Sequence, residues 1–163
     1  MGIDQGREPD SGAEQEGIEP KHVMLVPDRD LLIGYLELQG LKYVPLENGG
    51  VAVLYEKLDI FFEFVGDGEI ERRIVSVRVD YHRRYRSEAD TLKVVNQWNL
   101  QQRWPRLAVA RADDGVSVTG DAHMPVGSGV GLLYFLETLY VWIQGAIAAD
   151  KYLDSANDGS VNA

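Results

Sequence analysis

The chain has 163 residues and 45% hydrophobic content, which predicts one globular domain with a single core. Its net charge is -10, mostly from acids near the two ends, and this balance disfavours nucleic acid as a partner because binding requires neutralised phosphates. The absence of cysteine excludes disulfides, thiolate catalysis and cysteine-ligated zinc.

The two ends of the chain differ in composition from its middle. Residues 1–24 are rich in Gly, Glu, Asp and Pro and contain few aliphatic residues, so we expect a disordered acidic tail. Residues 154–163 lead to the same expectation, which leaves a folded domain over residues 25–153. No basic region followed by an apolar run is present at the N-terminus, and this favours a cytoplasmic protein.

The first half of the domain predicts a helix followed by four strands. Pro27 and Asp28 suit a helix start, apolar residues follow at helical spacing, and Gly40 is a stop signal. Short segments bounded by Gly and Asn turns then indicate strands. The predicted strands are Leu41–Leu46, Val51–Glu56, Asp59–Val65 and Glu69–His82.

The second half predicts a helix, a two-strand hairpin and a long helix. The first of these helices is capped near Ser87 and ends before Pro105. The hairpin pairs Leu107–Arg111 with Val116–Met124, and the last helix runs from about Ser128, its cap, to Tyr152. Because the strands come in consecutive runs with short turns, we expect an α+β fold with antiparallel strands.

One short motif carries a family resemblance. Asn96-Gln97-Trp98-Asn99 ends the second predicted helix, Arg103-Trp104-Pro105 follows, and the next hairpin turns at Asp113-Asp114-Gly115. With these residues the chain resembles, over roughly Asp28 to Leu153, the YbjN-type family of bacterial sensory transduction regulators. The resemblance implies a fold similar to type III secretion chaperones, and it implies no catalytic residues.

The residues of this motif allow a structural and a functional interpretation. The structural one has Trp98 packing its helix on the sheet, and Asn96 or Asn99 bonding to backbone near the helix end. The alternative makes the motif a recognition groove. The family motif residues, which we expect to be structural, are Asn96, Trp98, Asn99, Arg103, Trp104 and Pro105.

No catalytic or metal-binding constellation stands out. His22, His82 and His123 lack the dense spacing of metal ligands, and no serine lies in a nucleophile elbow. Alternating glycines before the last predicted helix lack the lysine of a phosphate-binding loop. Acids around the turn near Asp67 are typical of solvated turn residues. From the sequence we therefore expect a protein that is not an enzyme and that binds no metal and no cofactor.

The stretch Arg72–Arg86 is unusually basic, with six arginines and two interleaved tyrosines. Such a cluster can bind an anionic small molecule, an acidic peptide or nucleic acid. The alternative is that Arg78 and its neighbours pair across strands with acids of the third predicted strand. The candidate binding residues here are Arg78, Arg83, Arg84, Tyr85 and Arg86.

The last predicted helix is apolar nearly all round, although a single helical layer would bury only one stripe of it. The remaining surface is expected to meet a second subunit, giving a homodimer, or to form an exposed groove. Tyr134 and Trp142 are the candidate contact residues. Glu137 near the middle of the apolar run argues against a membrane span.

These patterns predict a non-enzymatic bacterial regulatory or chaperone-like adaptor that binds a protein or peptide partner. Binding would use strand addition or an apolar groove. The alternative is a sensory module that binds an anionic small molecule through Arg72–Arg86.

Overall fold

The computed structural model describes residues 23–67, 70–112 and 115–159. The helices are α1 (Arg29–Leu38), α2 (Glu88–Gln101) and α3 (Leu132–Gly159). The strands are β1 (Met24–Leu25), β2 (Tyr43–Pro45), β3 (Val51–Leu54), β4 (Leu58–Asp67), β5 (Ile70–Tyr85), β6 (Arg106–Ala112), β7 (Gly115–Pro125) and β8 (Val130–Gly131). The predicted residues His22, Glu69, Asp113 and Asp114 lie outside the described part of the chain.

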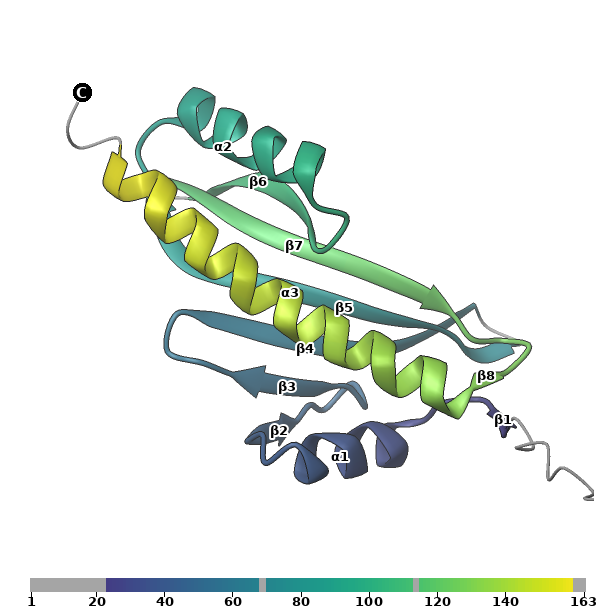
Figure 1. The fold of residues 1–163 in the computed structure, drawn as a ribbon. Helices are drawn as coiled ribbons and strands as arrows, with labels where there is room; N and C mark the ends of the chain where they lie inside the picture. The colour runs from purple at the N-terminus through teal and green to yellow at the C-terminus, as the bar shows by residue number, and fades with distance from the viewer. Residues whose placement is uncertain (1–22, 68–69, 113–114, 160–163) are drawn as a thin grey trace, which may run out of the picture.

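Six of the strands form one antiparallel sheet in the order β2-β3-β4-β5-β7-β6, and β1 pairs separately with β8. Helix α3 crosses one face of the sheet (Figure 1). Helix α1 lies beside the N-terminal half of α3, and α2 lies beside its C-terminal half. The predicted α+β class, element order and antiparallel pairing are confirmed. The likeness to type III secretion chaperones stays a prediction.

Side chains at the helix ends explain where α1 and α2 begin. The carboxylate of Asp28 accepts a hydrogen bond from the amide of Leu31 at 2.9 Å, and the hydroxyl of Ser87 accepts from the amide of Asp90 at 3.2 Å. Each cap satisfies an amide that has no partner inside the helix. Gly40 follows α1 with a φ of 67°, a left-handed conformation that favours glycine.

Alternate residues of the central strands build the core. Ile60 pairs with Val79 and Phe62 with Val77, and these four side chains are at most 3% exposed. Burying each large apolar side chain stabilises the fold by about 1.5–3 kcal/mol. Helix α3 contributes its fully buried residues to the same core: Phe135, Leu139, Ala146, Ala149 and Leu153.

Two predicted boundaries of the last helix are wrong. The predicted disordered tail from Asp154 is helical as far as Gly159, because Leu153 is buried and Asp154 pairs with Lys57 at 3.0 Å. Ser128 is not the cap, because α3 begins at Leu132, whose amide donates to the carbonyl of Val23 at 3.0 Å. The backbone of the segment before α1 thus replaces a capping side chain.

The predicted N-terminal tail, residues 1–24, extends into residues that belong to the fold. Met24 lies in β1 and pairs with Gly131 of β8. Residues 1–22 and 160–163 lie outside the described part of the chain. The two-residue strands β1 and β8 carry no alternating pattern of their own, which is why the sequence did not indicate them.

Candidate functional site

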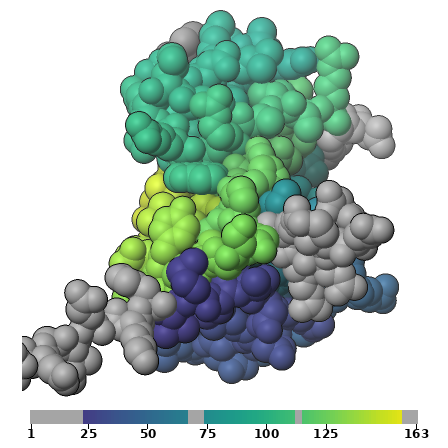
Figure 2. Space-filling view, turned by 90° about the vertical axis from the view of Figure 1, so that its right-hand side faces the viewer, coloured from purple at the N-terminus to yellow at the C-terminus, as the bar shows by residue number. Residues whose placement is uncertain are grey.

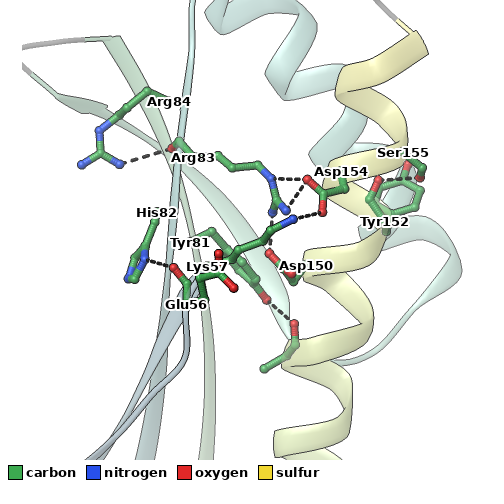
Figure 3. Close-up of polar contacts among 11 residues, drawn as sticks. Glu56, Lys57, Tyr81, His82, Arg83, Arg84, Asp150, Tyr152, Asp154 and Ser155 are labelled. Atoms are coloured by element: carbon green, nitrogen blue, oxygen red, sulfur yellow. Dashed lines mark hydrogen bonds and ion pairs between the residues drawn. The ribbon is translucent and has the colours of Figure 1, made fainter.

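The described side chains of the basic stretch, from Arg78 to Arg86, do not form one surface. Figure 3 shows the Arg83 side chain directed toward α3, whereas His82 and Arg84 point the opposite way. Arg83 Nη1 lies 2.5 Å from Asp150 Oδ1, and Arg83 Nε donates to Asp154 Oδ1 at 2.8 Å. The Arg83 side chain is only 13% exposed. Its charge is therefore engaged within the fold and is not presented to an anionic ligand.

The ionic cluster around Arg83 joins β5 to the C-terminal half of α3. Burial alone would lower the pKa of the Arg83 guanidinium, but its hydrogen bonds to Asp150 and Asp154 raise that pKa above its ordinary value. Lys57, followed by Arg83, lowers the pKa of the Asp154 carboxyl. Beneath the cluster the Tyr81 hydroxyl donates to the carbonyl of Ala146 at 3.3 Å. Burial raises the pKa of Tyr81 well above its usual range, so Tyr81 remains a neutral donor.

Tyr85 also faces inward, in the partly buried layer beside Arg83. Its hydroxyl oxygen is buried and has no hydrogen-bond partner among the described residues. Burial is the main cause that raises the pKa of Tyr85. Tyr85 is therefore packed at the end of the sheet and does not interleave with the exposed arginines.

From Ser76 to Arg84, the β5 residues on the uncovered face of the sheet are polar, and several of them pair with neighbouring residues of β5 or β4. Arg78 Nε lies 3.3 Å from Asp80 Oδ1, and the Arg78 guanidinium stacks 4.7 Å above the ring of Phe61 on β4. His82 pairs with Asp59 on the neighbouring strand β4. This is the kind of cross-strand pair that the sequence offered as the alternative to a binding surface. Arg84 and Arg86 are exposed, and Arg84 Nη1 donates to the carbonyl of Arg83 at 3.2 Å.

Both ring nitrogens of His82 face hydrogen-bond acceptors. Nε2 lies 3.0 Å from Asp59 Oδ2, and Nδ1 lies 3.1 Å from the carbonyl oxygen of Glu56. Only the protonated imidazole donates from both nitrogens, so this arrangement favours the charged form. The hydrogen bond to Asp59 is the main reason that the pKa of His82 lies above its ordinary value, although partial burial opposes it.

We expect the His82–Asp59 pair to make stability depend weakly on pH. The contribution is fully present below about pH 6.5 and is lost as the pH rises through the folded-state pKa of His82. Because the His82 side chain is 43% exposed, the loss is below about 1 kcal/mol. Asp59→Asn should lower the His82 pKa in an NMR titration, whereas Asp121→Asn should leave it unchanged. An unchanged His82 pKa in Asp59→Asn would contradict the assignment.

The tryptophan motif fixes α2 and the following loop to the sheet. Trp98 is 6% exposed, and its Nε1 donates to the carbonyl of Pro105 at 2.8 Å. The Asn99 side chain accepts from the amide of Leu107 and donates to the carbonyl of Leu107, both at 2.9 Å. These contacts hold α2 and the segment before β6 on the sheet, and they place Trp104 at the side of α3. Asn96 and Arg103 are exposed.

An exposed strand edge lies beside Trp104. Strand β6 begins only at Arg106, which pairs with Asp121 of β7. Ala122–Pro125 of β7 therefore have β5 on one side and, within the described residues, no strand on the other. Figure 1 shows this end of β7 extending past β6. Unpaired backbone groups at such an edge are a template for another strand.

A hollow of about 360 Å³ follows this edge. We call it the β7-edge groove, and it is lined by Trp104, His123, Met124, Pro125, Tyr134, Glu137, Thr138, Val141 and Trp142. Figure 2 looks onto this side, where β7 and the first part of α3 lie between the α2 and α1 ends of the molecule. Tyr134 and Val141 are 59% and 47% exposed, whereas Trp142 is buried and packs edge-to-face on Trp104 at 5.6 Å. The groove thus has an apolar floor and an accessible apolar wall.

Of the candidate contact residues on α3, Tyr134 is a surface residue and Trp142 is part of the floor. The sequence did not indicate a site role for Met124 or the free edge of β7. The unequal lengths of the two predicted hairpin strands were a signal, because Val116–Met124 is longer than Leu107–Arg111 and must extend beyond it. A second hollow of about 490 Å³ lies between α1 and α3, lined by Tyr35, Leu38, Gln39, Leu136, Glu137, Tyr140 and Val141.

Among the described residues, no group of three His, Asp or Glu side chains is placed to hold a metal ion. Helix α3 has the length and apolar composition of a membrane-crossing helix over Leu132–Ala156, and core helices of soluble proteins share those properties.

The comparisons with known proteins place this chain in a family. The sequence profile named YbjN, described as "Putative bacterial sensory transduction regulator", matches residues 28–155. The chain belongs to the YbjN family. The match runs from the N-cap of α1 into the C-terminal part of α3, so the YbjN region contains the β7-edge groove and the tryptophan motif.

One solved structure agrees with this assignment. The crystal structure of YbjN from E. coli, described as "a putative transcription regulator", is similar to this structure with a TM-score of 0.60 and 13% sequence identity. The similarity covers 85% of this chain and 96% of that chain. At this identity the likeness shows the fold alone. No curated protein matches the chain.

Proposed function

We propose that this YbjN-family protein is a non-enzymatic regulatory adaptor of the bacterial cytoplasm that binds an extended segment of a partner protein. The single observation that carries the proposal is the β7-edge groove, where a free strand edge and an apolar hollow run side by side. Peptide backbone groups need hydrogen-bond partners, and an exposed edge supplies them to an incoming strand.

The geometry of the groove favours a particular kind of segment. Successive side chains of a strand point to opposite sides, so every second side chain of an added strand faces the hollow. In the hollow, these side chains meet apolar contact surfaces from Met124, Tyr134 and Val141. The matching segment therefore carries apolar side chains at alternate positions. Backbone bonds supply affinity and the hollow supplies selectivity.

Burial of α3 supports a soluble adaptor without membrane insertion. Phe135, Leu139 and Ala146 are fully buried on the core side of α3. Moving α3 into a bilayer would separate this side from the sheet and expose the core residues of β4 and β5 to water. That exposure costs about 25 cal/mol of free energy per Å² of apolar surface.

Affinity capture from the native cells, followed by mass spectrometry, tests the proposal. The Tyr134→Lys/Val141→Lys variant puts charge on the exposed wall of the groove without touching the core. The matched control is Leu100→Lys, which changes a leucine of α2 that is 82% exposed. We expect wild type and Leu100→Lys to capture the same protein and the groove variant to lose it. Equal capture by all three proteins would move the binding site away from the groove.

A further inference from the structure

The outer side of α3 carries a stripe of exposed residues with an internal symmetry. Figure 1 shows that α1 and α2 leave this side of α3 uncovered. The exposed residues that recur every three or four positions are Leu133, Glu137, Tyr140, Gln144, Ala148, Lys151 and Ser155. Their spacings are the same on both sides of Gln144. They therefore form a single stripe, which we call the α3 stripe, on one side of the helix.

We propose that a second copy of this chain packs on the α3 stripe with its own α3 antiparallel, the two helices crossing at Gln144. A two-fold axis at Gln144 brings each residue opposite the one equally far on the other side. Gln144 then faces its own copy, and Glu137 faces Lys151 of the other copy. Tyr140 faces Ala148, so a large side chain meets a small one on each side of the axis.

Charge complementarity selects a second copy of this chain as the occupant. Glu137 and Lys151 are both seven residues from Gln144, which is about 10 Å along the helix on either side. Both are exposed, and neither has an ion-pair partner among the described residues. The antiparallel arrangement places Glu137 of each copy opposite Lys151 of the other copy, so two equivalent ion pairs form. A parallel arrangement would place like charges together.

Exposed apolar surface makes the contact favourable. Leu133 is 73% exposed and Tyr140 is 54% exposed, both on the α3 stripe. Large apolar side chains gathered on one helix side mark an interaction surface. Tyr134 and Val141 of the β7-edge groove lie roughly 60–80° further round the helix from Gln144, at 100° per residue. The dimer contact and the peptide groove are therefore neighbouring surfaces that share Glu137, and this inference does not rest on the proposed function.

A single-cysteine variant tests the crossing point, because the natural chain has no cysteine. Gln144→Cys places one thiol at the two-fold axis, where its copy lies opposite. We expect mild oxidation to convert most of this variant to a disulfide-linked dimer. Leu100→Cys, on the exposed side of α2, is the control and should stay largely unlinked. Equal linking of the two variants, or no linking of Gln144→Cys, would overturn the proposed crossing.

A charge exchange tests the register independently. In analytical ultracentrifugation, Glu137→Lys should raise the dimer dissociation constant on the order of tenfold, because each substitution acts twice. Glu137→Lys/Lys151→Glu should restore the wild-type value. Circular dichroism checks that these surface variants keep the fold. A wild-type protein that is monomeric at every concentration would overturn the proposal, as would a dimer unaffected by Glu137→Lys. The Tyr134→Lys/Val141→Lys variant should remain dimeric while losing its partner protein, which separates a failure of one proposal from a failure of the other.

Discussion

Replacing Trp98 by alanine is expected to lower the free energy of unfolding by about 3–5 kcal/mol, the usual cost of truncating a buried aromatic residue. Trp98 is 6% exposed, and its ring packs against Tyr152 of α3 at a centroid distance of 5.3 Å. Truncation also removes the donor to the carbonyl of Pro105. Leaving a buried carbonyl without its partner adds to the cost. Urea unfolding followed by circular dichroism measures the difference.

The control for this prediction is Leu100→Ala, two residues further along α2 on its exposed side. A surface change of this kind should alter stability by no more than about 0.5 kcal/mol. A Trp98→Ala protein that is as stable as wild type but fails to bind its partner would contradict the structural role and restore the recognition interpretation of the motif.

Replacing Arg83 by methionine is expected to destabilise the fold by about 3 kcal/mol, the lower end of the cost of removing one partner from a buried ion pair. Asp150 would lose its neighbour at 2.5 Å while remaining buried on α3. The methionine keeps most of the aliphatic volume of the arginine, so the loss reports the charge. Thermal and urea unfolding near neutral pH measure it.

Arg84→Met is the matched control for Arg83→Met, because its side chain is exposed and points away from α3 (Figure 3). We expect a change of at most about 0.5 kcal/mol there. The double variant Arg83→Met/Asp150→Leu should lose less stability than the sum of its single variants, since it removes both charges together. Additive losses would show that Arg83 and Asp150 are not coupled.

Much of the fold was readable from local patterns. The alternation of Val75, Val77 and Val79 indicated a strand with one buried side, and the caps Asp28 and Ser87 were recognisable from their positions before apolar runs. The last helix was recognisable, but its end was not. The composition of residues 154–159 favours disorder, and the ion pairs of Asp154 with Lys57 and Arg83 are tertiary contacts that composition does not reveal.

The site was harder to predict because it depends on pairing between distant elements. Arg83 and Arg84 are adjacent in a basic run, yet strand alternation sends them to opposite sides, and the acids that neutralise Arg83 lie on α3. The free edge of β7 arises because β6 begins only at Arg106, opposite Asp121. Whether a strand has a free edge depends on its register with the neighbouring strand. The lengths of two strands indicate that register only in part. Trp104, just before β6, and Met124 of β7 both line the groove.

Hydrogen–deuterium exchange of the wild-type protein, with and without the protein recovered by affinity capture, tests strand addition at β7 most directly. We predict that peptides containing Ala122–Met124 exchange more slowly in the complex, while peptides from β2, at the other edge of the sheet, do not change. Slower exchange confined to the uncovered sheet face around Arg78, or an unchanged rate at Ala122–Met124 in a complex that demonstrably forms, would contradict the proposed site.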